Sequence, residues 1–436
     1  MNEKALEALE QDSIFASLSR SQQQYLLETG ANLRLSRQYL RQLTEAAADL
    51  EMWDEGNLKE LLDPLMNHPK VLKMQGTQRN AYLIGMLREE LDRMRSGEIE
   101  YQGFHPRRPA AGRHLFVDQS DRPMQLLGAC PVAGEKTRCC NLLTLDAVRQ
   151  CGFACSYCSI QSFYDRQRIY FFSDLPRRLQ EISSTLDQDQ LYHIGTGQSS
   201  DSLMFGNRHG VLDALTDFAR DNPRVILELK TKSGNIAYLL ENRDRIPENL
   251  ICTWSLNPQL IIEKEEHRTA SLSQRLDAAR RTAEAGILTG FHIHPMIRYT
   301  GWQKDYRELF LQLQEEFSPQ HTVMISFGTL TFIKPVLQQL RSMGIKSRVL
   351  QIPLSDASGK YSYPREMKEE LFSFAYQCFS SEWKQQVFFY LCMEPASLWN
   401  PVFGFSYRDN EAFEQAMKSA YFEKIQSLRE RSRNGL

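Results

Sequence analysis

The chain has 436 residues, of which 42% are hydrophobic, 24% charged and 10% aromatic. Lysine and arginine number 52 against 54 acidic residues, which gives a formal net charge of −2 at pH 7. This composition is typical of a globular protein of about two to four domains and excludes a disordered or collagen-like chain. The near-neutral balance gives no global sign of a nucleic-acid partner and leaves room only for a local basic patch.

Neither a membrane span nor a secretory signal is apparent. No apolar run reaches the roughly 18 residues that a membrane-spanning helix needs. The first residues, MNEKALEALEQDSIF, are charged and lack the apolar core of a signal peptide. We therefore expect a cytoplasmic protein without membrane contact. In that compartment, nine cysteines indicate metal or redox chemistry rather than a disulfide framework.

Residues 1–100 are predicted to form a helical N-terminal domain. Apolar side chains recur at helical spacing over 37–53 and over 79–95. The region holds 12 basic and 17 acidic residues, a net charge of −5, so it is a poor candidate for binding phosphates alone. Packing or a protein partner suits it better. Residues 101–124 follow, rich in Pro, Gly and Arg and without periodicity, and we predict a linker or arm there.

Residues 125–335 are predicted to form an α/β domain. Apolar, strand-like runs alternate with helical patterns, which indicates βα units with parallel strands. Six units are too few for a closed eight-stranded barrel, so we expect a partial (β/α)6 barrel with its chemistry at the C-terminal strand ends. Residues 336–436 are predicted to be a mixed α+β C-terminal region. The six predicted strands are 142–147, 191–197, 225–232, 250–257, 289–296 and 322–329.

Three closely spaced cysteines follow the first predicted strand. Cys151, Cys155 and Cys158 have the spacing C-x3-C-x2-C. A loop of this length suits three corners of one 4Fe-4S cluster and leaves the fourth iron open for a substrate or cofactor. A structural zinc site is the alternative, but such sites favour two cysteine or histidine pairs with four ligands. Three incidental thiols are the other alternative.

This spacing, after the first strand of a βα array, resembles the radical S-adenosylmethionine enzymes. Further segments along the chain narrow the resemblance to the spore photoproduct lyase family, including its non-spore members. The resemblance covers about 125–400 and leaves the helical N-terminal region outside. The segments are CSYCSIQSFY (155–164), GTGQSSDSL (195–203), ELKTKSGN (228–235), WSLNP (254–258), TASLSQRLDAAR (269–280), GFHIHPMIRYTGW (290–302), SFGTL (326–330) and YLCMEP (390–395).

The resemblance implies a fold, two cofactors and a reaction. It implies a radical S-adenosylmethionine barrel whose 4Fe-4S cluster is held by Cys151, Cys155 and Cys158. It places Ser200, Lys232 and Ser255 in contact with S-adenosyl-L-methionine. It also implies a 5′-deoxyadenosyl radical that abstracts hydrogen from DNA spore photoproduct, and an electron donor of the flavodoxin or ferredoxin type.

Two positions depart from the lyase pattern. Gln198 stands where the lyases place a hydrogen-donating cysteine, and Ser159 stands where they place a radical-relay tyrosine. Tyr157 is therefore our candidate relay residue. Cys392 is the candidate donor, with a buried core thiol as the alternative. The chain is therefore expected to keep the cofactor chemistry without the usual donor steps, which favours another lesion or another substrate.

Three functions are compatible with the sequence. The first is a radical S-adenosylmethionine enzyme, photoproduct-lyase-like, that repairs or modifies nucleic acid. The second is the same chemistry on a small molecule or protein, and the third is a non-enzymatic iron–sulfur sensor.

The roles of five further residues stay open. Cys130, Cys139 and Cys140 are either buried thiols, metal ligands or a redox group. His292 and His294 share one strand face, as core histidines, substrate contacts or a proton relay.

Overall fold

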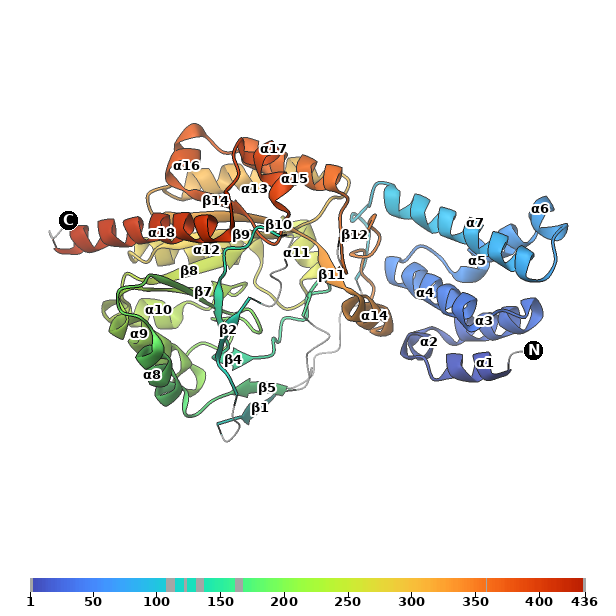
Figure 1. Cartoon of the computed structure of the whole chain (residues 1–436), viewed down its shortest axis with the longest axis horizontal. Helices are drawn as coiled ribbons and strands as arrows, with labels where there is room; N and C mark the ends of the chain where they lie inside the picture. Colours follow the sequence, from blue (N-terminus) through green and yellow to red (C-terminus); the bar gives the residue numbers. More distant parts are fainter. Residues whose placement is uncertain are drawn as a thin grey trace.

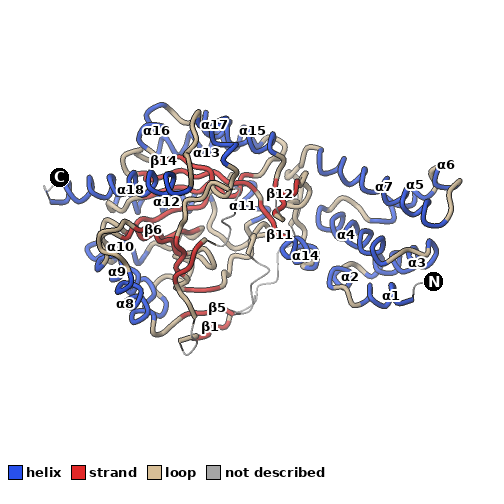
Figure 2. Tube along the Cα trace, in the orientation of Figure 1, coloured by secondary structure: helices blue, strands red, loops and turns tan. Residues whose placement is uncertain are grey.

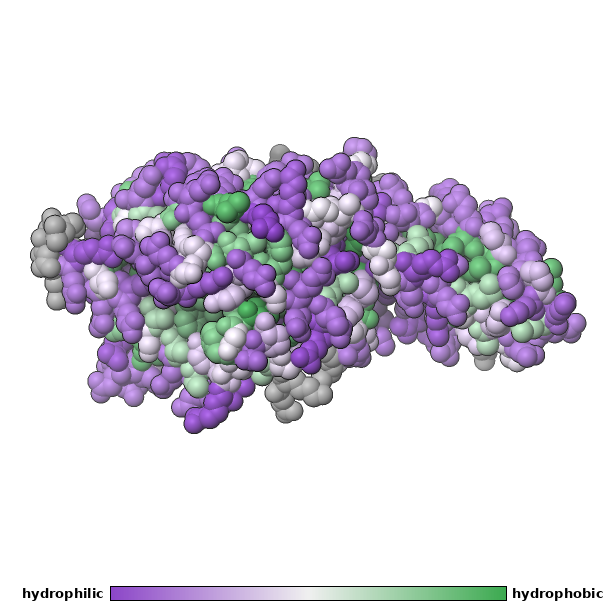
Figure 3. All heavy atoms as spheres, turned by 90° about the horizontal axis from the view of Figure 1, so that it is seen from above, coloured by the Kyte–Doolittle hydropathy of each residue, from purple (hydrophilic) through white to green (hydrophobic). Residues whose placement is uncertain are grey.

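The computed structural model describes residues 3–106, 114–120, 124–130, 137–160, 168–357 and 359–433. The N-terminal helices form a lobe at one end of an elongated molecule, and a sheet surrounded by helices forms the larger body (Figure 1). The face seen in Figure 3 is mainly hydrophilic. Within the described ranges, no helix is both long enough and apolar enough to span a membrane.

The N-terminal lobe is entirely helical in the described residues (Figure 2). Both periodic segments of the sequence form helices as predicted, 37–53 as α4 and 79–95 as part of α7. The end of the domain at residue 100 stays a prediction. The helices are α1 (Glu3–Glu10), α2 (Ser13–Ser17), α3 (Arg20–Leu33), α4 (Arg37–Trp53), α5 (Leu58–Met66), α6 (Pro69–Leu72) and α7 (Gly76–Ser96).

Some acidic side chains of this lobe form ion pairs with basic side chains of the body. Helix α14 (Lys334–Ser342) lies against α2 and α4. The buried carboxylate of Asp49 in α4 accepts bonds from Arg341 Nε at 2.7 Å and from Arg95 Nη2 at 2.9 Å. Next to it, Arg348 Nη1 pairs with Glu55 at 2.7 Å. The acidic side chains facing the body therefore have basic partners within the same chain.

The body is built on an eight-stranded sheet in the order β14-β10-β9-β8-β7-β6-β3-β2. All neighbours pair in parallel except β2, which pairs antiparallel with β3. All six predicted strands are present and the partial barrel is confirmed. The strands are β2 (Leu127–Ala129), β3 (Leu143–Leu145), β6 (Tyr192–Thr196), β7 (Val225–Thr231), β8 (Leu250–Ser255), β9 (Thr289–Met296), β10 (Thr322–Thr329) and β14 (Phe388–Leu391).

Helices between the strands cover the outer face of the sheet, which is why its central strands are almost wholly buried (Figure 2). Helix α18 (Asn410–Arg433) packs against β7, β10 and β14, and its Tyr421 ring lies 5.3 Å from the ring of His193. The connecting helices are α8 (Leu175–Thr185), α9 (Val211–Asp221), α10 (Ala237–Glu241), α11 (Gln259–Glu265), α12 (Leu272–Glu284) and α13 (Trp302–Glu316).

Strand β14 joins the sheet from the region predicted to be a separate C-terminal part, whose bounds stay a prediction. Its segment FFYL is too short and apolar to be assigned from periodicity. After it, Pro395 bridges to Thr137, and Arg138 N–H donates to the carbonyl of Glu394 at 3.0 Å. The curled sheet is thus tied together between its two ends. The other C-terminal helices are α15 (Arg365–Gln377), α16 (Ser381–Gln386) and α17 (Trp399–Phe403).

Two small sheets complete the body. One has the order β1-β5-β4 and the other β11-β13-β12. Strand β1 falls inside the segment predicted to be a linker, of which 107–113 and 121–123 lie outside the described residues. The strands are β1 (Leu115–Asp118), β4 (Val148–Arg149), β5 (Arg168–Phe171), β11 (Thr331–Ile333), β12 (Ser355–Ala357) and β13 (Lys360–Ser362).

Candidate active site

The cysteine loop begins directly after β4. Gln150 and Ala154 adopt positive φ angles of 76° and 55°, so the backbone turns sharply on both sides of Cys151. The loop is tied to the segment after β6, because Gln150 N–H donates to the carbonyl of Ser199 and Ser200 Oγ donates to the carbonyl of Gln150. The first cysteine is thereby held beside the C-terminal end of β6.

The three thiols lie close to one another. Burial, and after it the charge of Glu266, raises the pKa of the Cys155 thiol, and the neighbouring Cys151 and Cys158 raise it further. None of the three forms a disulfide. As the side chains stand, no group of three or more His, Cys, Asp or Glu residues in the described chain is arranged around a metal position. The donor set suits a thiolate-bound cluster, whose binding would require the three side chains to turn toward a common centre.

Residues 265–267 hold the cysteine loop from the other side. Ser156 N–H donates to the carbonyl of Glu265 at 2.9 Å, and Ser156 Oγ lies 2.8 Å from Nε2 of His267. The hydroxyl of Tyr157 donates to the carboxylate of Glu266. Ser156, Tyr157 and all three residues of the segment are buried. These contacts position the loop without using any of its cysteines.

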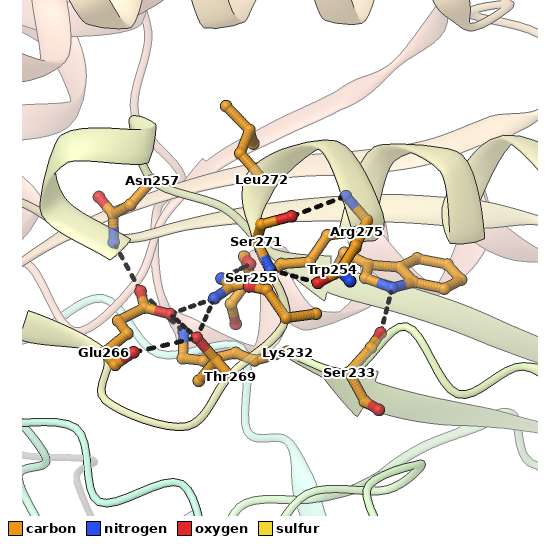
Figure 4. Close-up of polar contacts among 12 residues, drawn as sticks. Lys232, Ser233, Trp254, Ser255, Asn257, Glu266, Thr269, Ser271, Leu272 and Arg275 are labelled. Carbon is orange, nitrogen blue, oxygen red and sulfur yellow. Dashed lines mark hydrogen bonds and ion pairs between the residues drawn. The ribbon is translucent and has the colours of Figure 1, made fainter. Parts of the chain in front are cut away.

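Glu266 is the centre of a buried charged group (Figure 4). Its carboxylate forms an ion pair with Arg275 of α12, and Lys232 Nζ lies 3.9 Å from its Oε1. Burial opposes its ionisation, but the charges of Arg275 and Lys232 outweigh burial and lower its pKa to about 2. Arg275 Nη1 also donates to the carbonyl of Ser255 at 2.8 Å. One arginine therefore joins the end of β8 to the segment that holds the cysteine loop.

We expect Arg275→Met to destabilise the protein strongly. Both members of the Arg275–Glu266 pair are fully buried, so the substitution leaves a buried carboxylate whose nearest cation is Lys232. Removing one partner of such a pair costs about 3–5 kcal/mol. Denaturant unfolding would measure the loss. The matched control is Arg280→Met on the exposed face of the same helix, which should leave the unfolding midpoint unchanged, and an equal loss in both variants would contradict the argument.

The three residues predicted to contact S-adenosylmethionine lie at the ends of neighbouring strands. Ser200 follows β6, Lys232 follows β7 and Ser255 ends β8. Lys232 Nζ is 3.5 Å from the carbonyl of His294 and 5.7 Å from the centre of the Tyr157 ring. Its side chain is only 17% exposed. The structure thus gathers these residues at one mouth of the half-barrel, while their contact with the cofactor stays a prediction.

The two predicted catalytic residues lie on different parts of this mouth. Tyr157 faces Lys232 and Glu266 on the cysteine side. Cys392 follows β14, where its N–H donates to the carbonyl of Phe327 at 2.8 Å. Burial raises the pKa of the Cys392 thiol to about 12, so it keeps its S–H bond at neutral pH. No hydrogen bond or ion pair links the two side chains, and their catalytic roles stay predictions.

Sequence reasoning missed the carboxylates that build the site. Besides Glu266, the buried Asp201 accepts bonds from Leu203 N–H, Met204 N–H, Thr231 Oγ1 and Lys232 N–H. Asp201 thus fixes the loop after β6 onto the end of β7. That loop starts at Gly197, with φ +81°, where a Cβ would lie 2.6 Å from the carbonyl oxygen of Lys230. The sequence signal that could have indicated Glu266 was the pair of adjacent acidic residues in EEH (265–267), just before the 269–280 segment.

A second polar group lies deeper inside the half-barrel. The buried carboxylate of Glu228 on β7 accepts three hydrogen bonds, from His193 Nε2 at 2.9 Å, from His292 Nε2 at 2.7 Å and from Thr253 Oγ1 at 2.6 Å. Burial opposes its ionisation, but the bonds from His193 and His292 lower the pKa of Glu228 well below its usual value. Glu228 is therefore a buried anion inside the half-barrel, with hydrogen-bond donors around its carboxylate.

This group predicts a loss of stability in mild acid. Burial, and after it the charge of Lys230, lowers the pKa of His292 from 6.5 to about 4. The unfolded chain gains this proton near pH 6.5 and the folded chain only near pH 4, so the free energy of unfolding decreases as the pH falls between them. The difference corresponds to about 3 kcal/mol. Denaturation midpoints across this range should fall less steeply in His292→Asn, and an unchanged slope would contradict the assignment.

Comparison with known proteins finds relatives that share one description. Residues 145–350 match the family model described as spore photoproduct lyase. Over 152 residues the chain is 28% identical to the spore photoproduct lyase of Geobacillus sp. (strain Y412MC61), an alignment that covers 34% of this chain and 41% of that protein. Over 191 residues it is 23% identical to the lyase of Clostridium acetobutylicum, covering 40% and 53%. The chain therefore spans about half the length of these relatives.

Solved structures share the fold. A spore photoproduct lyase complexed with dinucleoside spore photoproduct superposes with a TM-score of 0.52 at 20% identity, covering 63% of this chain and 81% of that one. A variant with bound AdoMet and the same dinucleoside gives a TM-score of 0.51 at 20% identity, covering 63% and 80%.

The curled parallel sheet, with a three-cysteine loop at the mouth formed by its C-terminal strand ends, has the half-barrel fold of the solved spore photoproduct lyases. Residues 145–350 are similar to the spore photoproduct lyase family.

Proposed function

We propose that this protein is a radical S-adenosylmethionine enzyme that repairs or modifies nucleic acid. The observation that carries the proposal is the placement of the cysteine loop beside Lys232, at the C-terminal ends of neighbouring parallel strands. A cationic side chain that is largely buried at a barrel mouth suits the carboxylate of an amino-acid cofactor. The family match over 145–350 points to lesions of the photoproduct type.

In this proposal Cys151, Cys155 and Cys158 hold three irons of a 4Fe-4S cluster. When bound, the cluster and S-adenosyl-L-methionine supply a 5′-deoxyadenosyl radical by one-electron cleavage of the cofactor. Lys232 binds the methionine carboxylate, and the hydroxyls of Ser200 and Ser255 are placed for ribose or carboxylate oxygens. The sheet and its covering helices exclude water from the radical.

Lys232 should bind the cofactor rather than only support the fold. Lys232→Ala removes the cation that faces the cofactor carboxylate, and loss of one partner from a buried charge pair costs about 3 kcal/mol, or roughly 100-fold in affinity. Equilibrium binding of S-adenosylmethionine, with iron content measured in parallel, tests this. Lys304→Ala, an exposed lysine on α13, is the control. Unchanged cofactor affinity in Lys232→Ala would assign Lys232 to substrate or structure.

The experiment for the function itself is anaerobic reconstitution with iron, sulfide and S-adenosylmethionine. We propose that the protein works in the cytosol with a flavodoxin- or ferredoxin-type electron donor, for which dithionite substitutes in the assay. Formation of 5′-deoxyadenosine would be compared with irradiated DNA, undamaged DNA and no substrate. Stimulation by irradiated DNA, with altered bases among the products, is the expected result. Equal formation in all three would contradict a nucleic-acid substrate.

A second candidate is the same chemistry on a small molecule or protein. Gln198 favours it, because an amide cannot supply the hydrogen atom that the lyases take from a cysteine at this position. In the experiment above, this candidate predicts cofactor cleavage that DNA does not stimulate. A non-enzymatic iron–sulfur sensor predicts no cleavage at all by the reduced protein.

A further inference from the structure

A continuous chain of hydrogen bonds crosses the inner face of the sheet. It begins at Glu228 on β7, whose Oε1 lies 2.7 Å from Nε2 of His292 on β9. Nδ1 of His292 lies 2.7 Å from Oγ of Ser326 on β10, and this oxygen lies 3.0 Å from Nε2 of His294. Glu228, His292 and Ser326 are buried, whereas His294 is partly exposed. The chain therefore runs from the interior toward the mouth.

The carboxylate at the inner end sets the direction of every bond. An ionised carboxylate only accepts, so His292 must donate from Nε2, and a neutral ring then has an accepting Nδ1. Ser326 must donate its proton to that nitrogen, which leaves its oxygen to accept from Nε2 of His294. A neutral His294 that is protonated at Nε2 has a lone pair on Nδ1. Nδ1 of His294 has no hydrogen-bond partner among the described residues.

Gly328 leaves room for the His294 ring, and burial and nearby charges keep that ring neutral. Gly328 on β10 leaves the space that the ring occupies, since a Cβ there would lie 3.2 Å from Nε2 of His294. Burial and then the neighbouring His292 lower the pKa of His294, and Lys230 and Lys232 lower it further against the opposing charge of Glu228. A neutral ring at this position accepts a hydrogen bond instead of donating two.

Lys230 lies beside this acceptor. Its side chain is on the same face of β7 as that of Glu228, because side chains two residues apart on a strand share a face. It is partly buried, and its side-chain nitrogen forms no hydrogen bond or ion pair with a described residue. Its charge lowers the pKa of His294 and of Cys392, so the side chain is on the side of the sheet where these two residues lie. A partly buried lysine whose side chain has no partner among the described residues is suited to a ligand oxygen.

We propose that Nδ1 of His294 and Nζ of Lys230 together form a recognition site for an N–H group next to a carbonyl oxygen. This is the pattern on the imide edge of a thymine or uracil ring, which proteins read when a base is turned out of its stack. The inference rests on the proposed function, because it takes the substrate to be a nucleobase. It adds Ser326 as a positioning residue, which fixes the tautomer of His294 without touching the substrate.

Binding without turnover tests the site. Reconstituted protein with S-adenosylmethionine but no reductant is titrated with dinucleoside spore photoproduct and with its N3-methylated analogue. One lost hydrogen bond to a buried acceptor is worth about tenfold in affinity. Wild type should lose about that factor on methylation. His294→Phe, which keeps a ring against Gly328, should bind both ligands with similar affinity. An equal methylation penalty in both proteins would overturn the proposal.

The tautomer supplies a readout that does not depend on activity. Long-range nitrogen–proton NMR on protein with 15N-labelled histidine should find His294 protonated at Nε2 in wild type. Ser326→Ala breaks the chain while keeping the ring, and His294 should then populate both tautomers. Wild-type His294 protonated at Nδ1 would overturn the proposal.

The two proposals fail in different ways. Methyl-sensitive binding without cofactor cleavage after reduction would keep the recognition site and overturn the proposed reaction. Cofactor cleavage without binding of either dinucleoside would overturn the imide site and leave the radical chemistry standing.

Discussion

Iron binding and S-adenosylmethionine cleavage should both disappear when Cys151, Cys155 and Cys158 are replaced together by Ala. Three thiolates on one loop supply the protein ligands of a cluster with an open iron, and the remaining described cysteines lie elsewhere in the sequence. The loop itself is held by Ser156 and Tyr157 through residues 265–267, so the fold should survive. Iron per chain, visible absorption and 5′-deoxyadenosine yield measure the effect, and circular dichroism follows the fold.

Cys378→Ala is the matched control, because this thiol ends α15 and contacts none of the three. It should retain full iron content and cleavage. A triple variant that keeps four irons would place the cluster elsewhere. Roughly eight irons in wild type and four in the triple variant would assign a second cluster to Cys130, Cys139 and Cys140.

The strands were predictable because each is buried on both faces. Such strands are continuous apolar runs, and β9 and β10 span the residues that their sequences predict. Strand β14 has only four residues, and its assignment depends on pairing with β10, which is far away in sequence. Local pattern carries no information on that pairing. The same holds for the bridge between Thr137 and Pro395.

The sequence predicts residues of the site only where the spacing within a motif itself indicates the chemistry. The cysteines satisfy that condition, whereas Ser200, Lys232 and Ser255 were named through the resemblance to the lyase family, and their roles stay predictions. Glu266 and Arg275 do not satisfy that condition, because they are nine positions apart and only the turn between α11 and α12 brings them together. A buried ion pair of this kind has no local signature. The contacts that hold the cysteine loop are therefore known only from the structure.

The hydrogen donor decides how well the protein cleaves spore photoproduct, and we expect wild type to be a poor lyase. A carbon radical that remains after scission of the linking bond must take a hydrogen atom, and an amide N–H bond is too strong to give one readily. Gln198 therefore leaves the usual donor position without a thiol. Dinucleoside spore photoproduct should be consumed slowly, with cofactor cleavage exceeding thymine release. Release measured by chromatography, relative to 5′-deoxyadenosine formed, gives the coupling.

Gln198→Cys should raise thymine release at least several-fold, with Gln198→Ala as its matched control. Residual release by wild type should depend on Cys392, which keeps its proton at neutral pH and lies near Lys230 inside the half-barrel. Cys392→Ala should therefore abolish what remains, whereas Cys252→Ala, a thiol buried within β8, should not. Efficient thymine formation by wild type that persists in Cys392→Ala would show that neither position supplies the hydrogen atom. In that case the identity of residue 198 would not distinguish the substrate of this chain from that of the lyases.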